Sequence, residues 1–331
     1  MNNLAEDNYK HIYSWTIILE KIVANITPDI AKECADFCFA AIQFNIRNMQ
    51  SDREKTLASK FAKILEYVKQ IKSGNVQNNY TELYYKNPKR NSTEPPPPNT
   101  IPNHQLDGFT MNGQIPVLYW YFDERKNLFD APVINSAEQY KEAFKNLENK
   151  SFKYYGEAIN LFYSAFEKYK LRGKSVLIWG LAGLNCEAMA IWQGAEHVYV
   201  VDYNKPVCEH EKITVFNHEE LLRSGIKTDV AISFSSFEHD GLGRYGDPLN
   251  PNGDIEAMSA VRNFLRDDGF MFLGVPQGQD CLVWNAHRIY GEKRLPLLLN
   301  GWKTKTVFEQ TTNIGYPLGG MTHPLMVLSK G

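Results

Sequence analysis

The C-terminal half of the chain alternates short apolar runs with helical stretches, and this alternation constrains the fold more than any other feature. Helical patterns near 185–193, 219–224 and 255–265 separate the early runs. Seven runs rich in β-branched and aromatic residues are expected to form strands: 175–179, 197–201, 213–216, 230–234, 270–275, 303–310 and 325–329. Such a pattern predicts an α/β fold with a mostly parallel sheet covered on both faces. No helical stretch separates the last two runs, so we expect an antiparallel hairpin at the sheet edge.

A glycine-containing turn follows the first predicted strand. The strand ends at Gly180, and the chain continues through Gly183 into a helix that carries Glu187. The second strand finishes at Asp202 and Tyr203. In a doubly wound sheet, ligands bind beyond the carboxyl ends of the strands, where glycine permits close backbone approach and a carboxylate can accept two ribose hydroxyls. A dinucleotide-binding motif, G-x-G-x-x-G, has a third glycine that this turn lacks. The turn therefore favours S-adenosylmethionine, which has no pyrophosphate, over a dinucleotide. The alternative is an ordinary strand-to-helix turn without a ligand.

Polar side chains follow the predicted strand at 230–234. Ser233 and Ser235 are expected to line the cofactor side, and Glu238 and His239 come next. A histidine can take a proton from a hydroxyl near neutral pH, and a neighbouring carboxylate can raise its basicity. His239 is therefore a candidate catalytic base, with a purely structural hydrogen bond as the alternative.

The loop 240–254 contains four glycines, two prolines, three acidic residues and one arginine. A loop with so many conformationally special residues is usually shaped around a ligand. Arg244 is expected to clamp a carboxylate or a pair of sugar hydroxyls, and Tyr245, Asp247 and Asp254 to contact the acceptor. The seven-residue spacing of the three aspartates does not match an EF-hand loop, so no metal site is predicted.

A third polar cluster follows the fifth predicted strand. Asn285, His287, Arg288 and Tyr290 lie within six residues, beside Trp284. Asn285 and Arg288 are expected to bind the acceptor, and His287 is a second candidate base. The alternative is a polar helix start over the sheet edge, with His287 bonded to a backbone carbonyl.

The strings Phe234-Ser-Ser-Phe-Glu-His-Asp-Gly-Leu-Gly-Arg-Tyr-Gly-Asp-Pro-Leu-Asn-Pro-Asn-Gly-Asp254 and Asn285-Ala-His-Arg-Ile-Tyr-Gly291 resemble signatures of domain-of-unknown-function family 268, found in nematodes and bacteria. The similarity covers about 114–302. It implies a Rossmann-like, class I S-adenosylmethionine-dependent methyltransferase fold, with Asp202 at the ribose and Tyr203 near the adenine. Several members are similar to proteins encoded among polysaccharide genes, which implies methylation of a sugar hydroxyl. Where the family's first loop commonly has a serine followed by Pro-Trp, this chain has Leu181 to Asn185.

The N-terminal part of the chain differs from the C-terminal half in its pattern of apolar residues and in its composition. Residues 1–72 show one-sided apolar stripes and predict a helical bundle region that packs on itself or on the later domain; a partner-binding module, or a homodimer formed through these helices, is the alternative. A Pro- and Asn-rich linker is expected over 73–103, before a methyltransferase-like domain over 104–331 whose sheet core begins at 174. Within it, a strand is expected at 115–122. Helices are expected at 136–147 and 152–171.

Charge, cysteine content and hydropathy indicate which partners and which cellular location to expect. The chain has 36 Lys and Arg against 38 Asp and Glu, so nucleic acid is not expected as a partner. Five scattered cysteines indicate reduced thiols. No apolar run is long enough to span a bilayer and no signal peptide is visible, so we expect a cytoplasmic protein; a secretory location is the alternative if an anchor is missing from this chain.

These features together predict a methyltransferase of the EC 2.1.1 class that uses S-adenosyl-L-methionine. We expect O-methylation of a sugar or glycan hydroxyl, or of another hydroxylated small molecule. The first alternative is a catalytically silent methyltransferase-like protein that binds a ligand or a partner. The second is a nicotinamide-dependent enzyme or a sugar-nucleotide transferase on a similar sheet.

Overall fold

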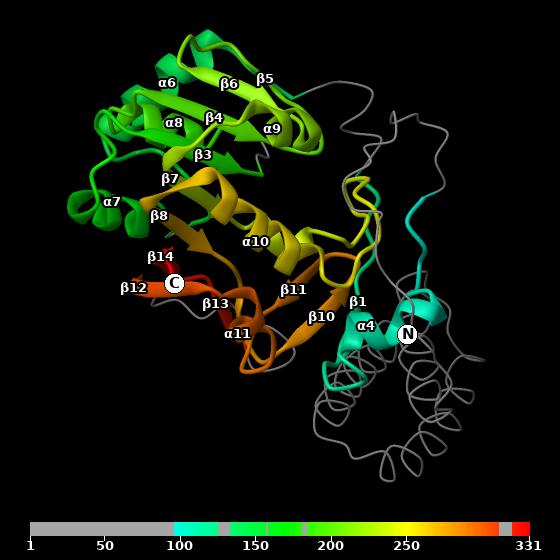
Figure 1. Cartoon of the computed structure of the whole chain (residues 1–331). Helices are drawn as coiled ribbons and strands as arrows, with labels where there is room; N and C mark the ends of the chain where they lie inside the picture. Colours follow the sequence, from blue (N-terminus) through cyan, green and yellow to red (C-terminus); the bar gives the residue numbers. More distant parts are fainter. Residues whose placement is uncertain (1–95, 125–132, 157, 181–183, 311–319) are drawn as a thin grey trace, which may run out of the picture.

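A seven-stranded sheet forms the centre of the computed structural model, which describes residues 96–124, 133–156, 158–180, 184–310 and 320–331 (Figure 1). From one edge to the other the strands are β12 (Trp302–Phe308), β14 (Leu325–Lys330), β8 (Leu265–Gly274), β7 (Thr228–Phe234), β3 (Ser175–Trp179), β4 (His197–Val201) and β6 (Ile213–Phe216). The predicted helical region over 1–72, and a dimer formed through it, lie outside the described residues.

The strand order defines the fold. β14 lies between β8 and β12 and is antiparallel to both, whereas β6, β4, β3, β7 and β8 are all parallel. Counted along the chain, the seven strands lie in the order 3-2-1-4-5-7-6, with the seventh reversed. This is the class I methyltransferase fold, and it confirms the predicted parallel sheet with an antiparallel edge pair. From β3 the chain continues to β4 and β6 on one side of the sheet, and from β7 it continues to β8 on the other side. A crevice is therefore expected between β3 and β7 at the carboxyl ends of the strands.

Helices cover both faces of the sheet because the strand side chains alternate. Val176 and Ile178 belong to one core cluster, and Leu177 and Trp179 to the other. The first face is covered by α7 (Ala158–Lys168) and α8 (Cys186–Trp192), with α6 (Ala137–Glu148) packed against α8. The second is covered by α9 (His218–Ser224), α10 (Gly253–Phe264) and α11 (Arg294–Leu298).

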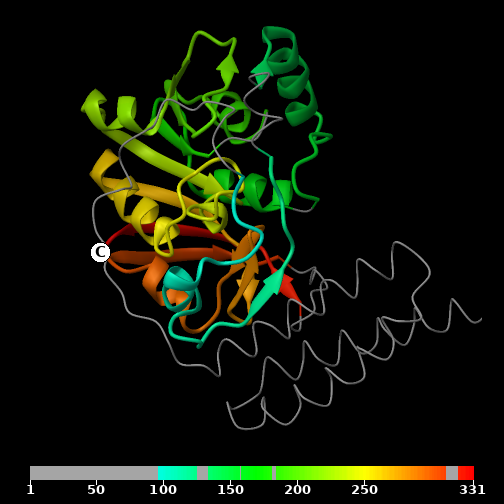
Figure 2. The same ribbon diagram turned by 90° about the vertical axis from the view of Figure 1, so that its right-hand side faces the viewer.

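A smaller three-stranded sheet lies beside the main one, and it joins two distant parts of the chain (Figure 2). In it β1 (Val117–Tyr119) runs parallel to β10 (Cys281–Trp284), which forms a hairpin with β11 (His287–Ile289). The buried Trp284 contacts Phe109 edge-on, which anchors the small unit. The remaining short elements are η1 (Asn103–Gln105), α4 (Leu106–Thr110), β2 (Ile134–Asn135), β5 (Val207–Cys208), η2 (Phe237–His239), β9 (Gln277–Gly278) and β13 (Met321–Thr322).

Two local expectations were wrong. The helix predicted over 152–171 begins only at Ala158, because Tyr155 and Gly156 have φ of 40° and 61°, which no right-handed helix contains. The polar cluster around Asn285 connects β10 to β11, so the alternative of a helix start is also wrong. Within the described residues, no helix combines the length and the hydropathy needed to cross a membrane.

Candidate active site

A cavity of about 330 Å³ lies at the carboxyl ends of β3, β4 and β7, at the predicted crevice. Its volume is within the usual range for small-molecule sites. The described residues that line it are Glu124, Val133, Tyr154, Tyr155, Trp179, Gly180, Asn185, Cys186, Val201, Asp202, Tyr203, Asn204, His218, Phe234, Ser235, Ser236, His239, Asp240, Tyr245 and Asp247. The structure therefore brings together residues that follow three separate strands.

The turn after β3 depends on Gly180. This residue has φ of 81°, and its N–H donates to the Val201 carbonyl at 2.9 Å. A Cβ at this position would lie 1.9 Å from the Ser236 Oγ, so the segment after β7 can approach only because glycine has no side chain. Glycine was expected here because a ligand would approach the backbone closely, whereas in the structure Ser236 of the same chain makes the close approach. Gly183 lies outside the described residues.

The end of β4 supplies a carboxylate beside an aromatic wall. The Asn204 N–H donates to Asp202 Oδ1 at 2.7 Å, which fixes the carboxylate just beyond the strand. Next to it, the Tyr203 and His218 rings lie 4.3 Å apart between centroids. Asp202 can therefore accept hydrogen bonds from a polar ligand whose flat part lies against these rings.

His239 lines the cavity, but its basicity differs from the expectation. Its Nδ1 lies 2.6 Å from the Ala286 carbonyl oxygen; because a carbonyl only accepts, Nδ1 carries the proton and Nε2 the lone pair. Burial, together with the Arg244 charge, lowers the pKa of His239 to about 3. We expected Glu238 to raise the basicity of His239, and this expectation was wrong. The His239 Nε2 lies 3.9 Å from the Glu238 carboxylate, and burial raises the pKa of Glu238 itself to about 7.

Arg244 forms part of the frame behind the cavity wall. Its guanidinium donates to Glu124 Oε1 at 2.7 Å and lies over the Phe122 ring, 4.3 Å from the centroid. It also donates to the Ala286 carbonyl at 3.3 Å, the oxygen that His239 uses. Arg244 thus orients Glu124 and His239, which line the cavity, although it was expected to clamp the acceptor directly.

The described wall of the cavity carries four acidic side chains. Glu124, Asp202, Asp240 and Asp247 contribute carboxyl groups, whereas neither lysine nor arginine lines the part of the wall that the structure describes. An anionic ligand such as a pyrophosphate would be repelled there. A cationic or hydroxyl-rich ligand would find acceptors on several sides.

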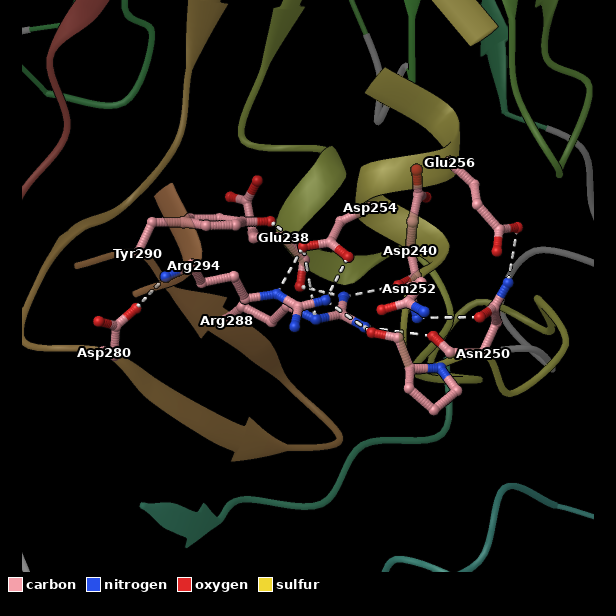
Figure 3. A network of polar contacts seen from close by, with 11 residues as sticks. Glu238, Asp240, Asn250, Asn252, Asp254, Glu256, Asp280, Arg288, Tyr290 and Arg294 are labelled. Atoms are coloured by element: carbon pink, nitrogen blue, oxygen red, sulfur yellow. Dashed lines mark hydrogen bonds and ion pairs between the residues drawn. The ribbon is translucent and has the colours of Figure 1, made fainter. Parts of the chain in front are cut away.

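Three residues expected at the acceptor do not reach the cavity, because Asp254, Asn285 and Arg288 are all buried. Figure 3 shows Asp254 and Arg288 within one network of polar contacts. Asp254 pairs with Arg294 at 2.6 Å and accepts from the Tyr290 hydroxyl at 3.0 Å. Arg288 donates to the Asp240 carbonyl at 2.6 Å, and Asn285 Nδ2 donates to the Phe122 carbonyl at 2.8 Å. Since their polar groups bond within the chain, these residues build the site rather than line it.

Three more predicted residues lie near the cavity without lining it. Glu187 is buried, where the Asn185 N–H donates to its carboxylate at 2.9 Å, and Ser233 donates to the Trp179 carbonyl at 3.0 Å. The His287 ring is 6.3 Å from that of His239, and burial with the Arg244 charge lowers its pKa to about 4. Glu187 therefore stabilises the start of α8, Ser233 links the ends of β7 and β3, and His287 lies behind His239.

Several lining residues were not predicted. Trp179 is the last residue of β3, so its place at the end of a strand could have indicated it. Glu124 and Tyr155 had no such signal, because they lie in segments brought to the cavity by tertiary packing.

The fold and the position of the cavity define a class I methyltransferase-like protein. Residues 173–321 match the family described as "Caenorhabditis protein of unknown function, DUF268", which confirms the resemblance over that segment. No curated protein matches the chain.

Solved methyltransferase structures are similar at low identity. The Burkholderia thailandensis 1,6-didemethyltoxoflavin-N1-methyltransferase with bound S-adenosylhomocysteine is 17% identical with a TM-score of 0.38, over 61% of this chain and 92% of that one. The N-methyltransferase NodS from Bradyrhizobium japonicum is 11% identical with a TM-score of 0.38, over 56% and 96%.

Proposed function

We propose that this protein is an S-adenosylmethionine-dependent methyltransferase. The observation that carries the proposal is the acidic and aromatic cavity at the carboxyl ends of β3, β4 and β7. A sulfonium cofactor is cationic at sulfur and has no pyrophosphate, so it suits carboxyl-lined walls. The same walls disfavour a nicotinamide dinucleotide or a sugar nucleotide, whose phosphates would face carboxylates.

The residues present suit the parts of this cofactor. Asp202 would accept hydrogen bonds from the ribose hydroxyls, and the pair of Tyr203 and His218 rings would lie against the adenine. Gly180 and Ser235 would lie nearest the methionine part. When bound, the cofactor supplies a methyl group on a sulfonium that is already a strong electrophile, so the chain has mainly to hold donor and acceptor in line.

We further propose a hydroxyl as the acceptor, on a sugar, a glycan or another hydroxylated small molecule. His239 Nε2 carries a lone pair and can accept a hydrogen bond from such a hydroxyl, while Tyr245 and Asp247 lie on the same wall. A pKa of about 3 makes His239 a weak proton acceptor, so its contribution here is orientation.

Isothermal titration calorimetry of the full chain tests the cofactor. S-Adenosylmethionine and S-adenosylhomocysteine should bind and NAD should not. Asp202→Asn should weaken both 10- to 100-fold, because hydrogen bonds to a charged group contribute about 1.5–3 kcal/mol. The matched control is Asp267→Asn, whose exposed carboxylate pairs with Lys330 at the opposite end of the sheet. If none of the three ligands binds, the proposed cofactor is refuted and the alternative of a catalytically silent binding protein is favoured. Unchanged affinity in Asp202→Asn would refute the assignment of Asp202 to the ribose.

A labelling experiment tests the acceptor. The chain is incubated with methyl-labelled S-adenosylmethionine and an extract of its source cells, and the labelled product is identified by mass spectrometry. A methyl ether on a hydroxylated small molecule or glycan is expected. A methylated nitrogen would refute O-methylation while keeping the methyltransferase.

A further inference from the structure

Asp240 differs from the two other aspartates of its loop. Asp247 accepts from the Gly243 N–H at 2.9 Å and from the Tyr245 N–H at 3.3 Å, and Asp254 is bonded to Arg294 through both oxygens. Asp240 lines the cavity with 9% of its surface exposed, yet its Oδ2 is buried and has no hydrogen-bond partner within the described residues. A buried carboxyl oxygen without a partner is costly, so a function for it is expected.

The backbone of Asp240 is held rigidly. Its N–H donates to the Phe237 carbonyl at 3.1 Å, and its own carbonyl accepts from Arg288 Nη1 at 2.6 Å. Figure 3 shows the Asp240 side chain pointing away from Arg288 and Asp254. The buried network thus fixes the peptide of residue 240 and leaves its carboxyl group on the cavity wall.

The surroundings of Asp240 favour its protonated form. Burial raises its pKa well above the ordinary value of 3.8, and three aspartates raise it further while Arg288 lowers it. The charged groups that act on it come from four elements or their ends: Asp247 in the loop, Arg288 in β11, Asp254 in α10 and Asp202 after β4. Both Asp240 and His239 line the cavity, and Asp240 holds a proton more tightly than His239 does.

We propose that Asp240 is the proton acceptor of the methyl transfer, an inference that rests on the proposed function. A lone pair of the acceptor hydroxyl forms the bond to the methyl carbon as the sulfur–methyl bond breaks and its electron pair stays on sulfur. The hydroxyl proton passes to the Asp240 carboxylate. The sulfonium charge is lost, the carboxylate becomes a neutral acid, and the products are the methyl ether and neutral S-adenosylhomocysteine.

This role requires Asp240 to ionise before the transfer. A cationic donor in the same cavity favours the carboxylate over the neutral acid, whereas its thioether product does not. Binding of S-adenosylmethionine should therefore release more protons than binding of S-adenosylhomocysteine, even without an acceptor.

Calorimetry of the full chain at pH 7 in phosphate and in Tris measures this difference, because the two buffers have different ionisation enthalpies. The wild type should release more protons with S-adenosylmethionine, and Asp240→Asn should abolish the difference. Glu238→Gln is the matched control, since burial also raises the pKa of that buried acid but Glu238 does not line the cavity. Equal proton release by both ligands in the wild type, or loss of the difference in Glu238→Gln alone, would overturn the proposal.

Label transfer into the source extract gives the second readout. Asp240→Asn should bind S-adenosylmethionine within a few-fold of the wild type and transfer label about 100-fold more slowly or worse, and Asp240→Glu should recover part of the rate. Wild-type transfer by Asp240→Asn would overturn the proposal. Failure of the wild type to bind S-adenosylmethionine would instead refute the proposed function. Should Asp240→Asn not fold, the wild-type proton release decides alone.

Discussion

Removal of the Asp254 carboxylate should strongly destabilise the protein. Asp254 is fully buried, and Arg294 and Arg288, which are 3% and 2% exposed, lie 2.6 Å and 3.7 Å from its oxygens. Asp254→Ala leaves two buried guanidinium groups without this counter-charge. Breaking such a pair costs about 3–5 kcal/mol, which for a domain of this size corresponds to a fall in Tm of roughly 6–20 °C.

Thermal unfolding followed by circular dichroism measures this effect. The matched control is Glu219→Ala, which removes an ion pair between Glu219 and Arg223 on the exposed surface of α9 and should change stability by less than about 1 kcal/mol. A Tm for Asp254→Ala within about 2 °C of the wild type would refute the reasoning, because two uncompensated buried charges cannot be so inexpensive.

The contribution of Asp254 should also depend on pH. Burial by itself raises the pKa of this carboxyl, but Arg288 and Arg294 outweigh burial and lower the pKa below the ordinary 3.8. A group whose pKa is lower in the folded state stabilises the protein above its unfolded pKa, and this contribution is lost as the pH falls. The stability difference between the wild type and Asp254→Asn should therefore be constant above about pH 5 and shrink below about pH 4. A difference that grows on acidification would contradict the pairing.

Three further changes test other parts of the structure. Gly180→Ala should lower stability by at least about 1–2 kcal/mol, because the positive φ disfavours a side chain and the new Cβ would collide with Ser236, and it should weaken S-adenosylmethionine binding. Ser236→Gly in the same chain removes the collision and should recover part of both losses. Full affinity in Gly180→Ala would contradict the turn. The free energy of unfolding of the wild type should fall as the pH rises from about 5 to 7, because folding raises the pKa of Glu238 from 4.5 to about 7. Glu238→Gln should reduce that fall in urea titrations at each pH. An unchanged dependence of stability on pH in Glu238→Gln would contradict the raised pKa. Ser136→Ala removes the cap that accepts from the Gln139 N–H at 3.3 Å and should cost about 1 kcal/mol by thermal unfolding, and no loss would show the cap to be unimportant.

The main sheet was predictable because its signals are local. Most of its strands are short runs rich in apolar or β-branched residues, and three of the predicted ranges, including that of β3, agree with the structure at both ends. The alternation of Val176 and Leu177 between two cores follows from the pleat of a single strand. No information from distant residues is needed for such elements.

The small sheet was not predictable, because its pairing depends on distant segments. Val117 pairs with Leu282 in a parallel register, although most of the main sheet lies between them in the chain. The expected strand at 115–122 was correct in type but gave no indication of its partner. Glu124 reaches the cavity wall through this pairing and its contact with Arg244, so its place at the site was also hidden.

Within the candidate site, residue type and loop position did not separate lining residues from supporting ones. Asp247 and Asp254 are both acidic residues of one glycine-rich loop, and both were expected at the acceptor. The difference arises from α11, whose Arg294 reaches Asp254 and draws it into the interior. A partner about 40 residues away in the chain therefore decides which carboxylate can meet a ligand.

The Gly-Arg-Tyr-Gly-Asp-Pro string carries the family resemblance, yet most of its bonds build the loop. Gly243 and Gly246 have φ of 74° and 87°, and the Asp247 carboxylate accepts from the backbone N–H groups of residues 243 and 245. Arg244 holds Glu124. A match to this string therefore predicts the shape of the wall, whereas the proposed chemistry depends on Asp240, which precedes the string and whose Oδ2 has no hydrogen-bond partner among the described residues. Relatives could keep the loop and change the reaction by replacing that one carboxyl group.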